Sequence, residues 1–331
     1  MRIAINGFGR IGRIFLRSIL EKSGVEVIAI NDLASTETLA HLFKYDSVHR
    51  SFKGSVSSDE NYLVINGRQI KVLSVAQPAM LPWAELKIDL VIESTGRFTS
   101  KQAAQQHITA GAKQVIISAP SPDKDIQTVV LGVNDDEVDL KSLILSNASC
   151  TTNNVAAMVK ILDDNWGIVD GYITTVHSMT GDQSLHDAPH KDLRRARAAS
   201  ASIIPTTTGA AKAITSIFPH LTGKLGGAGI RVPVLNGSLT DFTCILKTQP
   251  TVEQINQAFK AAADGPMKNV LEYTEDPIVS SDILDNTHSC IFDAQLTSIV
   301  GDLVKVVGWY DNEMGYSSRL ADLVEKISKQ F

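Results

Sequence analysis

The feature that most constrains the fold is a glycine-rich turn close to the N-terminus, between a short apolar run and a helix-like segment. Residues 3–5 are apolar, and within 13–22 apolar residues recur roughly at helical spacing. A β-rich run at 25–30 follows and leads to Asp32. The turn carries three glycines in a G-x-G-x-x-G arrangement, Gly7, Gly9 and Gly12. This order predicts a dinucleotide-binding unit, which consists of a strand, a glycine turn, a helix, a second strand and an acidic residue.

Each glycine has a separate expected role in such a unit. Gly7 permits a tight turn, Gly9 lets the backbone approach a pyrophosphate, and Gly12 lets the helix pack closely on the strand. The N–H groups at the start of the helix favour an anion. Asp32 would accept hydrogen bonds from ribose hydroxyls and repel a 2′-phosphate, which favours NAD over NADP. The alternative is that the glycines only form a turn.

Alternating strands and helices continue through the first half of the chain. Further strands are expected at 90–93, 114–117, 129–133 and 143–145, with a helix at 100–110. This alternation predicts a doubly wound parallel sheet of the Rossmann type, an α/β fold. Ligands of such sheets bind at the carboxyl ends of the strands. Those ends are expected at 6–12, Asp32, 94–96 and 118–119, and Cys150 follows the last strand.

The pattern changes after residue 149. Strand-like runs occur at 173–176, 239–247, 290–297 and 303–310, with few helices between them. Such a pattern predicts an α+β domain with a mostly antiparallel sheet. We therefore expect an NAD-binding domain at 1–149 and a catalytic domain at 150–314. An amphipathic helix at 315–331 ends the chain.

Cys150 lies where an apolar run gives way to a helix-like run, at the expected N-terminus of a helix. The partial positive charge there favours a thiolate, which would make Cys150 a nucleophile. The alternative is an inert, buried cysteine beside a helix cap. His177, after the expected strand 173–176, is the natural base for such a thiol, although the chain has eight histidines from which to choose.

Hydroxyl and basic residues of the second half suggest anion binding. Thr208 and Gly209 precede a helix, whose first N–H groups would hold a phosphate. Thr180, Arg195 and Arg231 would add hydroxyl and guanidinium donors. Arg194 and Arg197 fit a solvated or subunit-facing loop equally well. Nucleic acid is a weaker alternative for this cluster, because no aromatic residues are interleaved with it.

Composition excludes several other classes of protein. The net charge of −5 over 331 residues gives no argument for nucleic acid or an anionic membrane as a partner. Three separated cysteines without a C-x-x-C pair indicate a reducing compartment and argue against a thiolate metal site, so no metal is expected. No apolar run is long enough to cross a membrane, and no signal peptide is evident, which makes the cytoplasm the expected location.

Three segments together resemble the phosphorylating glyceraldehyde-3-phosphate dehydrogenases. They are the glycine turn with its flanks (4–13), the block Ser-Asn-Ala-Ser-Cys-Thr-Thr-Asn (146–153) and the block Trp-Tyr-Asp-Asn-Glu (309–313). The resemblance covers essentially the whole chain. It implies oxidation of glyceraldehyde 3-phosphate to 1,3-bisphosphoglycerate in glycolysis or gluconeogenesis, with NAD as cofactor and inorganic phosphate as second substrate. It also implies a homotetramer whose C-terminal helix packs back on the NAD-binding domain.

The resemblance further implies roles for individual residues. Cys150 would be the nucleophile that forms a hemithioacetal and then a thioester, and His177 its base. Cofactor contacts would come from Arg10, Ile11, Asp32, Ser118 and Asn312. The phosphate of the substrate would bind to Thr180 and Arg231. Inorganic phosphate would bind to Ser149, Thr151, Thr208 and Gly209, with a further phosphate contact from Arg195.

The chain departs from the family pattern at four places. Ala76 stands near the position of a common arginine that touches the adenine end of the cofactor, and Ala188 replaces a leucine of NAD-specific members. Asn154 replaces a second cysteine four residues after the nucleophile. The segment Val-Pro-Val-Leu-Asn-Gly-Ser (232–238) also differs from the usual one. Acceptance of NADP beside NAD therefore remains open.

The sequence leaves two alternative functions to compare with this one. An erythrose-4-phosphate dehydrogenase would share the cysteine and histidine, but tends to lose the phosphate-binding segments that are present here at 180–183 and 206–209. A thiol-based redox sensor without turnover would use an oxidisable Cys150. Such a protein would be expected to have lost some of the catalytic residues, and all of them are present.

Overall fold

The computed structural model describes residues 1–330, which form two compact units. Unit 1 comprises Met1–Val129, Asp135–Ala148 and the residues from Leu320 onward. Unit 2 comprises Val130–Asn134 and Ser149–Arg319. The division of the main chain falls one residue before the predicted 149/150 boundary, and the last helix is shared between the units. Phe331, the end of the predicted 315–331 helix, lies outside the described residues.

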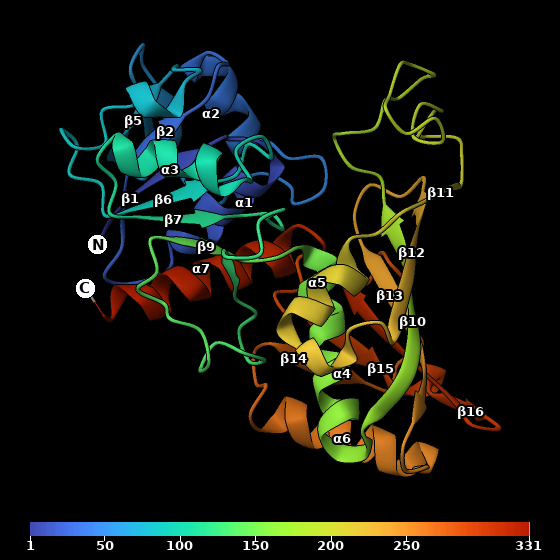
Figure 1. The fold of residues 1–331 in the computed structure, drawn as a ribbon. Helices are drawn as coiled ribbons and strands as arrows, with labels where there is room; N and C mark the ends of the chain where they lie inside the picture. The colour runs from blue at the N-terminus through green and yellow to red at the C-terminus, as the bar shows by residue number, and fades with distance from the viewer. Residues whose placement is uncertain (331) are drawn as a thin grey trace. The chain divides into compact units, whose positions relative to one another are not determined.

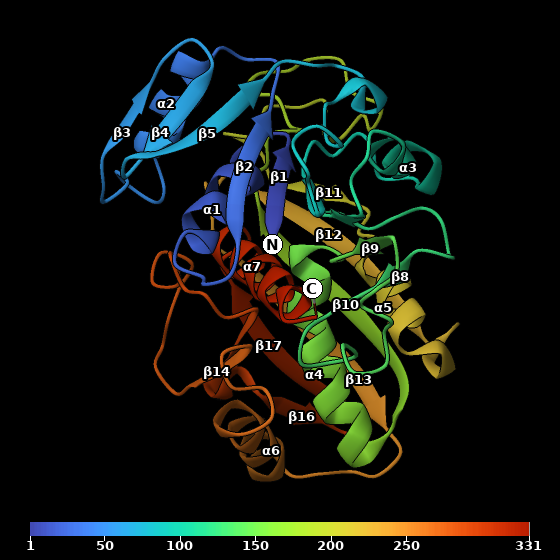
Figure 2. The ribbon, with the colours of Figure 1, turned by 90° about the vertical axis from the view of Figure 1, so that its left-hand side faces the viewer.

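Unit 1 is built on a nine-stranded sheet in the order β3-β4-β5-β2-β1-β6-β7-β9-β8. Pairs from β5 across to β8 are parallel, whereas β3–β4 and β4–β5 are antiparallel. The strands are β1 Arg2–Asn6, β2 Glu26–Asn31, β3 Val56–Ser58, β4 Tyr62–Ile65, β5 Arg68–Leu73, β6 Leu90–Glu93, β7 Gln114–Ile117, β8 Gln127–Thr128 and β9 Ile144–Ser146. The predicted Rossmann-type parallel sheet is confirmed, and the antiparallel strands extend one edge of it (Figure 2).

The helices of unit 1 connect these strands, as expected for a doubly wound sheet. They are α1 Arg10–Ile19, α2 Thr36–Lys44, the 3₁₀ helix η1 Pro78–Met80 and α3 Lys101–Thr109. The central strands are apolar and buried on both faces because helices and loops cover them: all four residues of β6 and of β7 are buried. The predicted strand at 129–133 is wrong, since the strand nearest to it, the two-residue β8, ends at Thr128 and the chain turns from residue 131 onward.

The final helix, α7 (Met314–Ser328), is tied to unit 1 by ion pairs from its C-terminal half. Lys22 contacts Asp322 and Glu325 at 2.6 and 2.9 Å, and Lys326 contacts Asp135 and Asp136. Within residues 1–330, no helix is both long and apolar enough to cross a bilayer.

Unit 2 contains a second sheet in the order β11-β12-β10-β13-β17-β15-β14, with β16 paired to β17. Five of the pairs are antiparallel, while β10–β12 and β14–β15 are parallel. The strands are β10 Ile168–Ser178, β11 Ile204–Thr206, β12 Leu225–Val232, β13 Ser238–Leu246, β14 Leu271–Thr274, β15 Cys290–Asp293, β16 Ser298–Val300 and β17 Leu303–Tyr310. The predicted mostly antiparallel sheet is confirmed.

Three α-helices of unit 2 pack against one face of this sheet (Figure 1). The helices of the unit are α4 Cys150–Trp166, α5 Ala210–Ile217, α6 Val252–Asp264 and the 3₁₀ helices η2 Pro219–Leu221 and η3 Ala294–Leu296. Two expectations need correction here. The strand expected at 290–297 ends at Asp293, where η3 begins, and His177 lies within β10 rather than after its end.

Candidate functional site

The glycine turn of unit 1 has the geometry that its sequence predicts. Gly7 adopts φ +92°, and a Cβ atom there would lie 2.7 Å from the Thr95 nitrogen. A Cβ atom on Gly12 would lie 2.3 Å from the Gly7 carbonyl oxygen, so the helix packs on the turn only because Gly12 has no side chain. A Cβ atom on Gly9 would meet nothing within 4 Å. The backbone at Gly9 therefore faces open space, as a ligand-binding turn requires.

The start of α1 fits a bound phosphate. Gly9 is its N-cap residue, no side chain caps it and no acidic residue lies in its first turn. By contrast, Ser35, Ser100, Ser149 and Thr251 cap α2, α3, α4 and α6. The first turn of α1, which includes Ile11, therefore has no side-chain cap at its N-cap residue, and N–H groups at such a helix start favour an anion. The pyrophosphate of a dinucleotide such as NAD is an anion of this kind.

The other predicted cofactor residues of unit 1 lie at the carboxyl ends of its strands. Asp32 follows β2, and its two carboxylate oxygens accept hydrogen bonds from the N–H groups of Phe8 (2.8 Å) and Ala34 (3.1 Å). Ser118 follows β7, and its N–H donates to the Glu93 carbonyl at 2.9 Å. The carboxylate of Asp32 is thereby oriented by backbone, and it keeps further lone pairs for ribose hydroxyls.

Arg10 forms a two-pronged ion pair with Asp46, whose side chain is almost fully buried. Burial alone would raise the pKa of Asp46, but the Arg10 guanidinium and the N–H groups of His49 and Val48 outweigh it and lower the pKa to about 2. Arg10 is therefore anchored beside the glycine turn. The sequence offered no signal that Asp46 would be its partner.

Cys150 is the first residue of α4, as predicted. The hydroxyl of Ser149 caps this helix by accepting the Thr152 N–H at 3.0 Å. The preceding residue, Ala148, is buried and adopts φ +57°, a conformation that costs a residue with a side chain free energy. This turn directs the chain from β9 into α4, so that the thiol lies at the helix start.

His177 is the partner of Cys150. The Sγ atom of Cys150 lies 3.4 Å from Nε2 of His177, and the imidazole is 5% exposed. The parallel pairing of β10 with β12 places Arg231 directly beside His177. Nη1 of Arg231 lies 2.7 Å from Nδ1 of His177 and 3.0 Å from the Ser178 carbonyl oxygen. Cys150, His177 and Arg231 thus form one contiguous group.

The charge state of His177 suits a base. Burial and the neighbouring Arg231 charge lower the pKa of His177 to about 3, so the imidazole is neutral near pH 7. Its Nδ1 has two close neighbours: the Ser178 carbonyl oxygen at 2.8 Å, which can only accept a hydrogen bond, and Nη1 of Arg231 at 2.7 Å, which can only donate one. Proton removal from Cys150 requires the tautomer with its proton on Nδ1, in which the lone pair of Nε2 faces the sulfur.

The three thiols differ in their surroundings. Burial raises the pKa of Cys150, while the Arg231 charge and the Thr151 N–H act in the opposite direction. The net direction is opposite to the thiolate bias that we predicted from the helix start alone. Cys244 and Cys290 are buried, and burial raises the pKa of Cys244 to about 12. All three cysteines are free.

Asn312 is held in one orientation. Its Oδ1 accepts hydrogen bonds from the hydroxyls of Ser178 (2.9 Å) and Ser238 (2.8 Å) and from the Gly237 N–H (3.2 Å). Three donors on one oxygen fix the amide, so its NH₂ group is presented on the opposite side. Asn312 belongs to unit 2, whereas the other predicted cofactor residues belong to unit 1.

Two of the predicted phosphate ligands share a partner that the sequence reasoning missed. Asp182 accepts a hydrogen bond from the Thr180 hydroxyl and pairs with Arg195 at 2.8 Å. Arg195 also donates to the Thr206 hydroxyl at 3.0 Å. Asp182 lies in the polar segment that contains Thr180, but only the fold brings Arg195 to it.

The segment at Thr208 and Gly209 also lies at a helix start. Gly209 is the N-cap of α5, and a Cβ atom there would meet nothing within 4 Å. The Thr208 hydroxyl accepts the N–H of Ala210, the first residue of α5, at 3.2 Å. Like α1, the α5 helix has a glycine as its N-cap residue. Both are helices for which the sequence predicts an anion.

Tyr310 is a further buried residue of the site. Its hydroxyl lies 2.8 Å from the Thr151 hydroxyl and 2.9 Å from the Thr175 hydroxyl, and its ring meets that of His177 edge-on. Tyr310 therefore links the first turn of α4 to β10, the two elements that carry Cys150 and His177. It lies in the Trp-Tyr-Asp-Asn-Glu block, but its sequence position gives no indication of this link.

Three of the departures from the family pattern, at Asn154, Ala188 and Ala76, can be located in the structure. Asn154 donates from its amide to the Trp309 carbonyl at 3.2 Å and is fully buried, so an amide bridge occupies the place of the second cysteine. Ala188 lies in the loop in which Asp187 and Arg197 pair at 2.9 Å. Ala76 is exposed and offers no side-chain donor.

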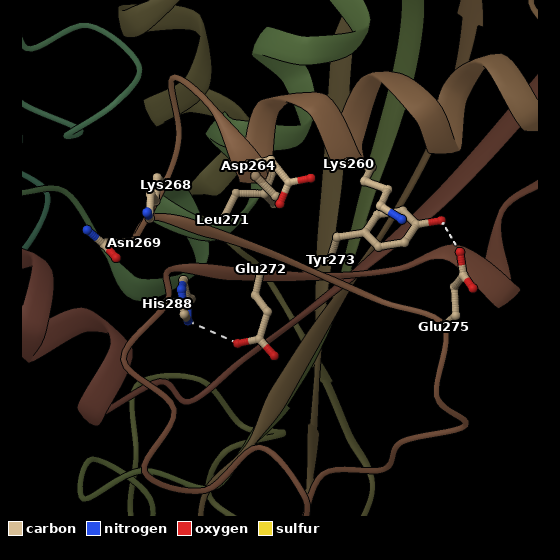
Figure 3. A pocket seen from close by; sticks show the side chains of 10 residues that line it. Lys260, Asp264, Lys268, Asn269, Leu271, Glu272, Tyr273, Glu275 and His288 are labelled. Carbon is tan, nitrogen blue, oxygen red and sulfur yellow. Dashed lines mark hydrogen bonds and ion pairs between the residues drawn. The ribbon is translucent and has the colours of Figure 1, made fainter.

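A separate hollow of about 470 Å³ lies between α6, β14 and the segment before β15 in unit 2 (Figure 3). Its polar groups are largely paired with one another: Glu272 with His288 at 3.0 Å, and Tyr273 with Glu275 at 2.9 Å. Lys260 lies over the Tyr273 ring at 5.5 Å. None of the predicted site residues lines this hollow, and its mutually paired charges indicate no particular ligand.

Comparison with known proteins agrees with this geometry. Residues 1–101 match the family described as glyceraldehyde 3-phosphate dehydrogenase, NAD binding domain, and residues 149–312 match the corresponding C-terminal domain. A glyceraldehyde-3-phosphate dehydrogenase of Mycobacterium avium is 54% identical over 336 residues, which cover 99% of each chain. Another from Streptomyces coelicolor is 54% identical over 334 residues, and glyceraldehyde-3-phosphate dehydrogenase 2 of Streptomyces avermitilis is 53% identical over 333 residues. In both of these the match covers 100% of this chain and 99% of the relative.

Proposed function

Since this chain belongs to the glyceraldehyde-3-phosphate dehydrogenase family, we propose that Cys150 and His177 perform its reaction. That reaction is the NAD-dependent, phosphorylating oxidation of glyceraldehyde 3-phosphate to 1,3-bisphosphoglycerate in glycolysis. The observation that carries the proposal is the 3.4 Å approach of the Cys150 sulfur to Nε2 of a neutral His177 at a helix start.

The first step joins the sulfur of Cys150 to the aldehyde carbon, and the product is a hemithioacetal. His177 takes up the thiol proton at Nε2 and returns it to the developing oxyanion, to which the Cys150 N–H at the start of α4 donates a hydrogen bond, so the hemithioacetal carries a hydroxyl and the imidazole is neutral again. When bound, NAD supplies the acceptor for the hydrogen and electron pair that leave the hemithioacetal carbon. His177 receives the hydroxyl proton as the thioester forms, so the same imidazole serves both proton transfers.

Inorganic phosphate then attacks the thioester carbon, the carbon–sulfur bond breaks, and the acyl phosphate leaves while Cys150 is regenerated. We assign the substrate's own phosphate to Thr180 and Arg231. The attacking phosphate is assigned to Ser149, Thr151, Thr208 and Gly209, with Arg195 as a further contact. The helix start at Gly209, where no Cβ atom would obstruct a ligand, and the guanidinium of Arg195, 19% exposed in its side chain, support this assignment.

We assign NAD binding to eight residues. Asn312 would contact the nicotinamide end, and the others are Gly7, Gly9, Arg10, Ile11, Gly12, Asp32 and Ser118. The fixed amide of Asn312 presents a donor suited to a carboxamide oxygen. Asp32 favours NAD because a 2′-phosphate would meet its carboxylate.

A steady-state assay of NADH formation tests these roles together. Glyceraldehyde 3-phosphate and erythrose 4-phosphate are compared, NAD is replaced by NADP, and inorganic phosphate is varied. We expect preference for the three-carbon aldehyde, for NAD and a requirement for phosphate, with no activity in Cys150→Ser. Preference for the four-carbon sugar or turnover independent of phosphate would contradict the proposal, and unchanged activity of Cys150→Ser would refute the role of the thiol.

We also propose that the chain forms a homotetramer in the cytoplasm. Two large apolar side chains on strands of the unit 2 sheet are exposed in this chain: Tyr172 on β10 is 51% exposed and Leu303 on β17 is 48% exposed. Exposed apolar side chains of this kind are suited to pack on a second copy. Three free thiols support a reducing compartment. Sedimentation analysis of the wild type and of Tyr172→Asp tests the assembly, and a monomeric wild type would contradict it.

A further inference from the structure

A row of buried polar side chains crosses unit 1 at the carboxyl ends of three adjacent parallel strands. Asn31 ends β2, Asn6 ends β1 and Glu93 ends β6, and the strand register pairs Asn6 with both of the others. Their exposed fractions are 6%, 1% and 1%. Polar groups buried to this extent need hydrogen-bond partners, and a carboxylate needs several.

The row is continuous through its hydrogen bonds. The amide of Asn31 donates to Oδ1 of Asn6 at 2.7 Å, and the amide of Asn6 donates to Oε2 of Glu93 at 2.6 Å. At its outer end, Asn31 exchanges two 2.9 Å hydrogen bonds with the backbone of Val75, which follows β5. The row thus connects the chain segments that leave β5, β2, β1 and β6.

Four donors converge on the carboxyl group of Glu93. Its Oε2 accepts from Asn6 and from Nε2 of His107 at 3.0 Å. Its Oε1 accepts from the N–H of Thr95 at 2.8 Å and from the Thr95 hydroxyl. Each of the two carboxyl oxygens therefore accepts two hydrogen bonds. A carboxylate, which only accepts hydrogen bonds, is the group that matches these four donors.

The donor from His107 is fixed by a second buried residue. Nε1 of Trp83 lies 3.0 Å from Nδ1 of His107, and an indole N–H can only donate. Nδ1 must therefore accept, so the imidazole proton lies on Nε2 and points at Glu93. Trp83 and His107 are both fully buried.

The three residues of the row immediately precede the segments that bind the cofactor. Gly7 follows Asn6, Asp32 follows Asn31, and residues 94–96 follow Glu93. The turns after β1 and β6 are in contact, because a Cβ atom on Gly7 would lie 2.7 Å from the Thr95 nitrogen. Glu93 holds Thr95 on one side and Asn6 on the other, and so sets the distance between these two turns.

Stability alone does not account for a carboxylate at this place. A buried charged group surrounded by neutral donors is seldom more stabilising than apolar residues of similar volume. Its value lies in fixing one geometry, because each of its four hydrogen bonds has a required direction.

We propose that Glu93 is a positioning residue for NAD. It acts through Thr95 and through Asn6 and Gly7 to hold the two turns in the geometry that accepts the nucleotide, and His107 and Trp83 fix its orientation. The Glu93 side chain itself makes no contact with the cofactor in this proposal. It is distinct from the proposed chemistry at Cys150, so its variants should affect cofactor affinity rather than the chemical step.

Glu93→Gln tests the proposal most directly. In one orientation the glutamine NH₂ group faces the donors of Asn6 and His107, and in the other it faces the N–H and hydroxyl of Thr95. Because donors then face donors, the two turns can no longer keep their spacing. In the full-length protein we expect the Kd for NAD, measured by calorimetry, to rise about tenfold, since a buried polar group loses its partners. The KM for glyceraldehyde 3-phosphate and kcat at saturating NAD should stay within about twofold of wild type.

A matched control separates positioning from general destabilisation. Gln114 is also buried in unit 1, but it begins β7 and donates to the Leu140 and Ser142 carbonyls at the opposite ends of the strands. Gln114→Leu should lower Tm through the loss of these bonds and leave the Kd for NAD unchanged. If Glu93→Gln lowers Tm but binds NAD as tightly as wild type, Glu93 is only structural and the proposal is overturned.

Two substitutions of His107 provide an independent test should Glu93→Gln fail to fold. His107→Gln can retain a donor near the position of Nε2, whereas His107→Asn can retain only the group near Nδ1. We expect His107→Gln to bind NAD more tightly than His107→Asn by about tenfold, because only the former keeps the hydrogen bond to Glu93. Equal affinities in the two variants would overturn the proposal.

Discussion

The guanidinium of Arg231 lies 2.7 Å from Nδ1 of His177, on the side of the imidazole opposite the thiol of Cys150. A residue assigned to the substrate's phosphate therefore also acts on the proposed base. Its charge disfavours the imidazolium, and burial acts in the same direction. A phosphate that binds to Arg231 would offset this charge, so the basicity of His177 depends on what Arg231 contacts.

Removal of Arg231 should make His177 more basic. In Arg231→Ala the pKa of His177 rises from about 3 toward its ordinary value, although burial still holds it below 6.5. Because the base must be neutral, the acid limb of the pH profile moves to higher pH. This is measured with glyceraldehyde, which lacks the phosphate. Arg197→Ala, which removes an exposed guanidinium paired with Asp187, is the control and should leave the acid limb in place.

The same variant should discriminate between substrates. Loss of a charged phosphate contact is expected to lower kcat/KM for glyceraldehyde 3-phosphate roughly 10- to 100-fold, with a much smaller effect on glyceraldehyde. A similar loss for both aldehydes would contradict the assignment of Arg231 to the substrate's phosphate.

Only one thiol should react in the folded chain. Cys150 is partly exposed beside a base, whereas burial excludes reagents from Cys244 and Cys290 and raises their pKa values. Iodoacetamide should therefore label one cysteine per chain, located at Cys150 by peptide mapping, with parallel loss of activity. In His177→Asn, the labelling of Cys150 should require higher pH because the proton acceptor is lost. Rapid labelling of Cys290 in folded protein would contradict this account.

The hydroxyl of Tyr310 should contribute both to stability and to the placement of Cys150. Tyr310→Phe removes the hydrogen bonds to Thr151 and Thr175, and we expect the free energy of unfolding to fall by about 1–2 kcal/mol. Denaturant titration measures this change, and kcat/KM should fall as well because α4 and β10 are no longer linked at the site. Tyr45→Phe is the control, since Tyr45 is 48% exposed.

Asn312→Asp should separate orientation from cofactor contact. The carboxylate can still accept hydrogen bonds from Ser178, Gly237 and Ser238, so Tm should change little. The NH₂ donor is lost, and the KM for NAD is expected to rise about tenfold. An unchanged KM would show that the amide of Asn312 does not contact the cofactor.

The parts of the fold that the sequence predicted well are those dominated by local interactions. The spans of β6, β7 and β17 coincide with the predicted runs, because buried strands of a sheet are bounded by polar turn residues. The segment 129–133 is equally apolar but forms no strand, since an apolar run alone does not determine which neighbour is available for pairing.

The sequence by itself determined which chemical groups this protein possesses and that a helix begins at Cys150, after Ser149. It predicted the helix after the glycine turn at 13–22, whereas α1 runs from Arg10 to Ile19 and packs on the turn because Gly12 has no side chain. Only the tertiary structure decided which groups meet. Arg231 reaches His177 because β10 and β12 pair in one register, Asp182 reaches Arg195 across a loop, and Asn31, Asn6 and Glu93 form a row only because three strands lie side by side. Helix starts and turns depend on hydrogen bonds between residues close in the chain, whereas these encounters depend on strand pairing between distant residues, which no local pattern specifies.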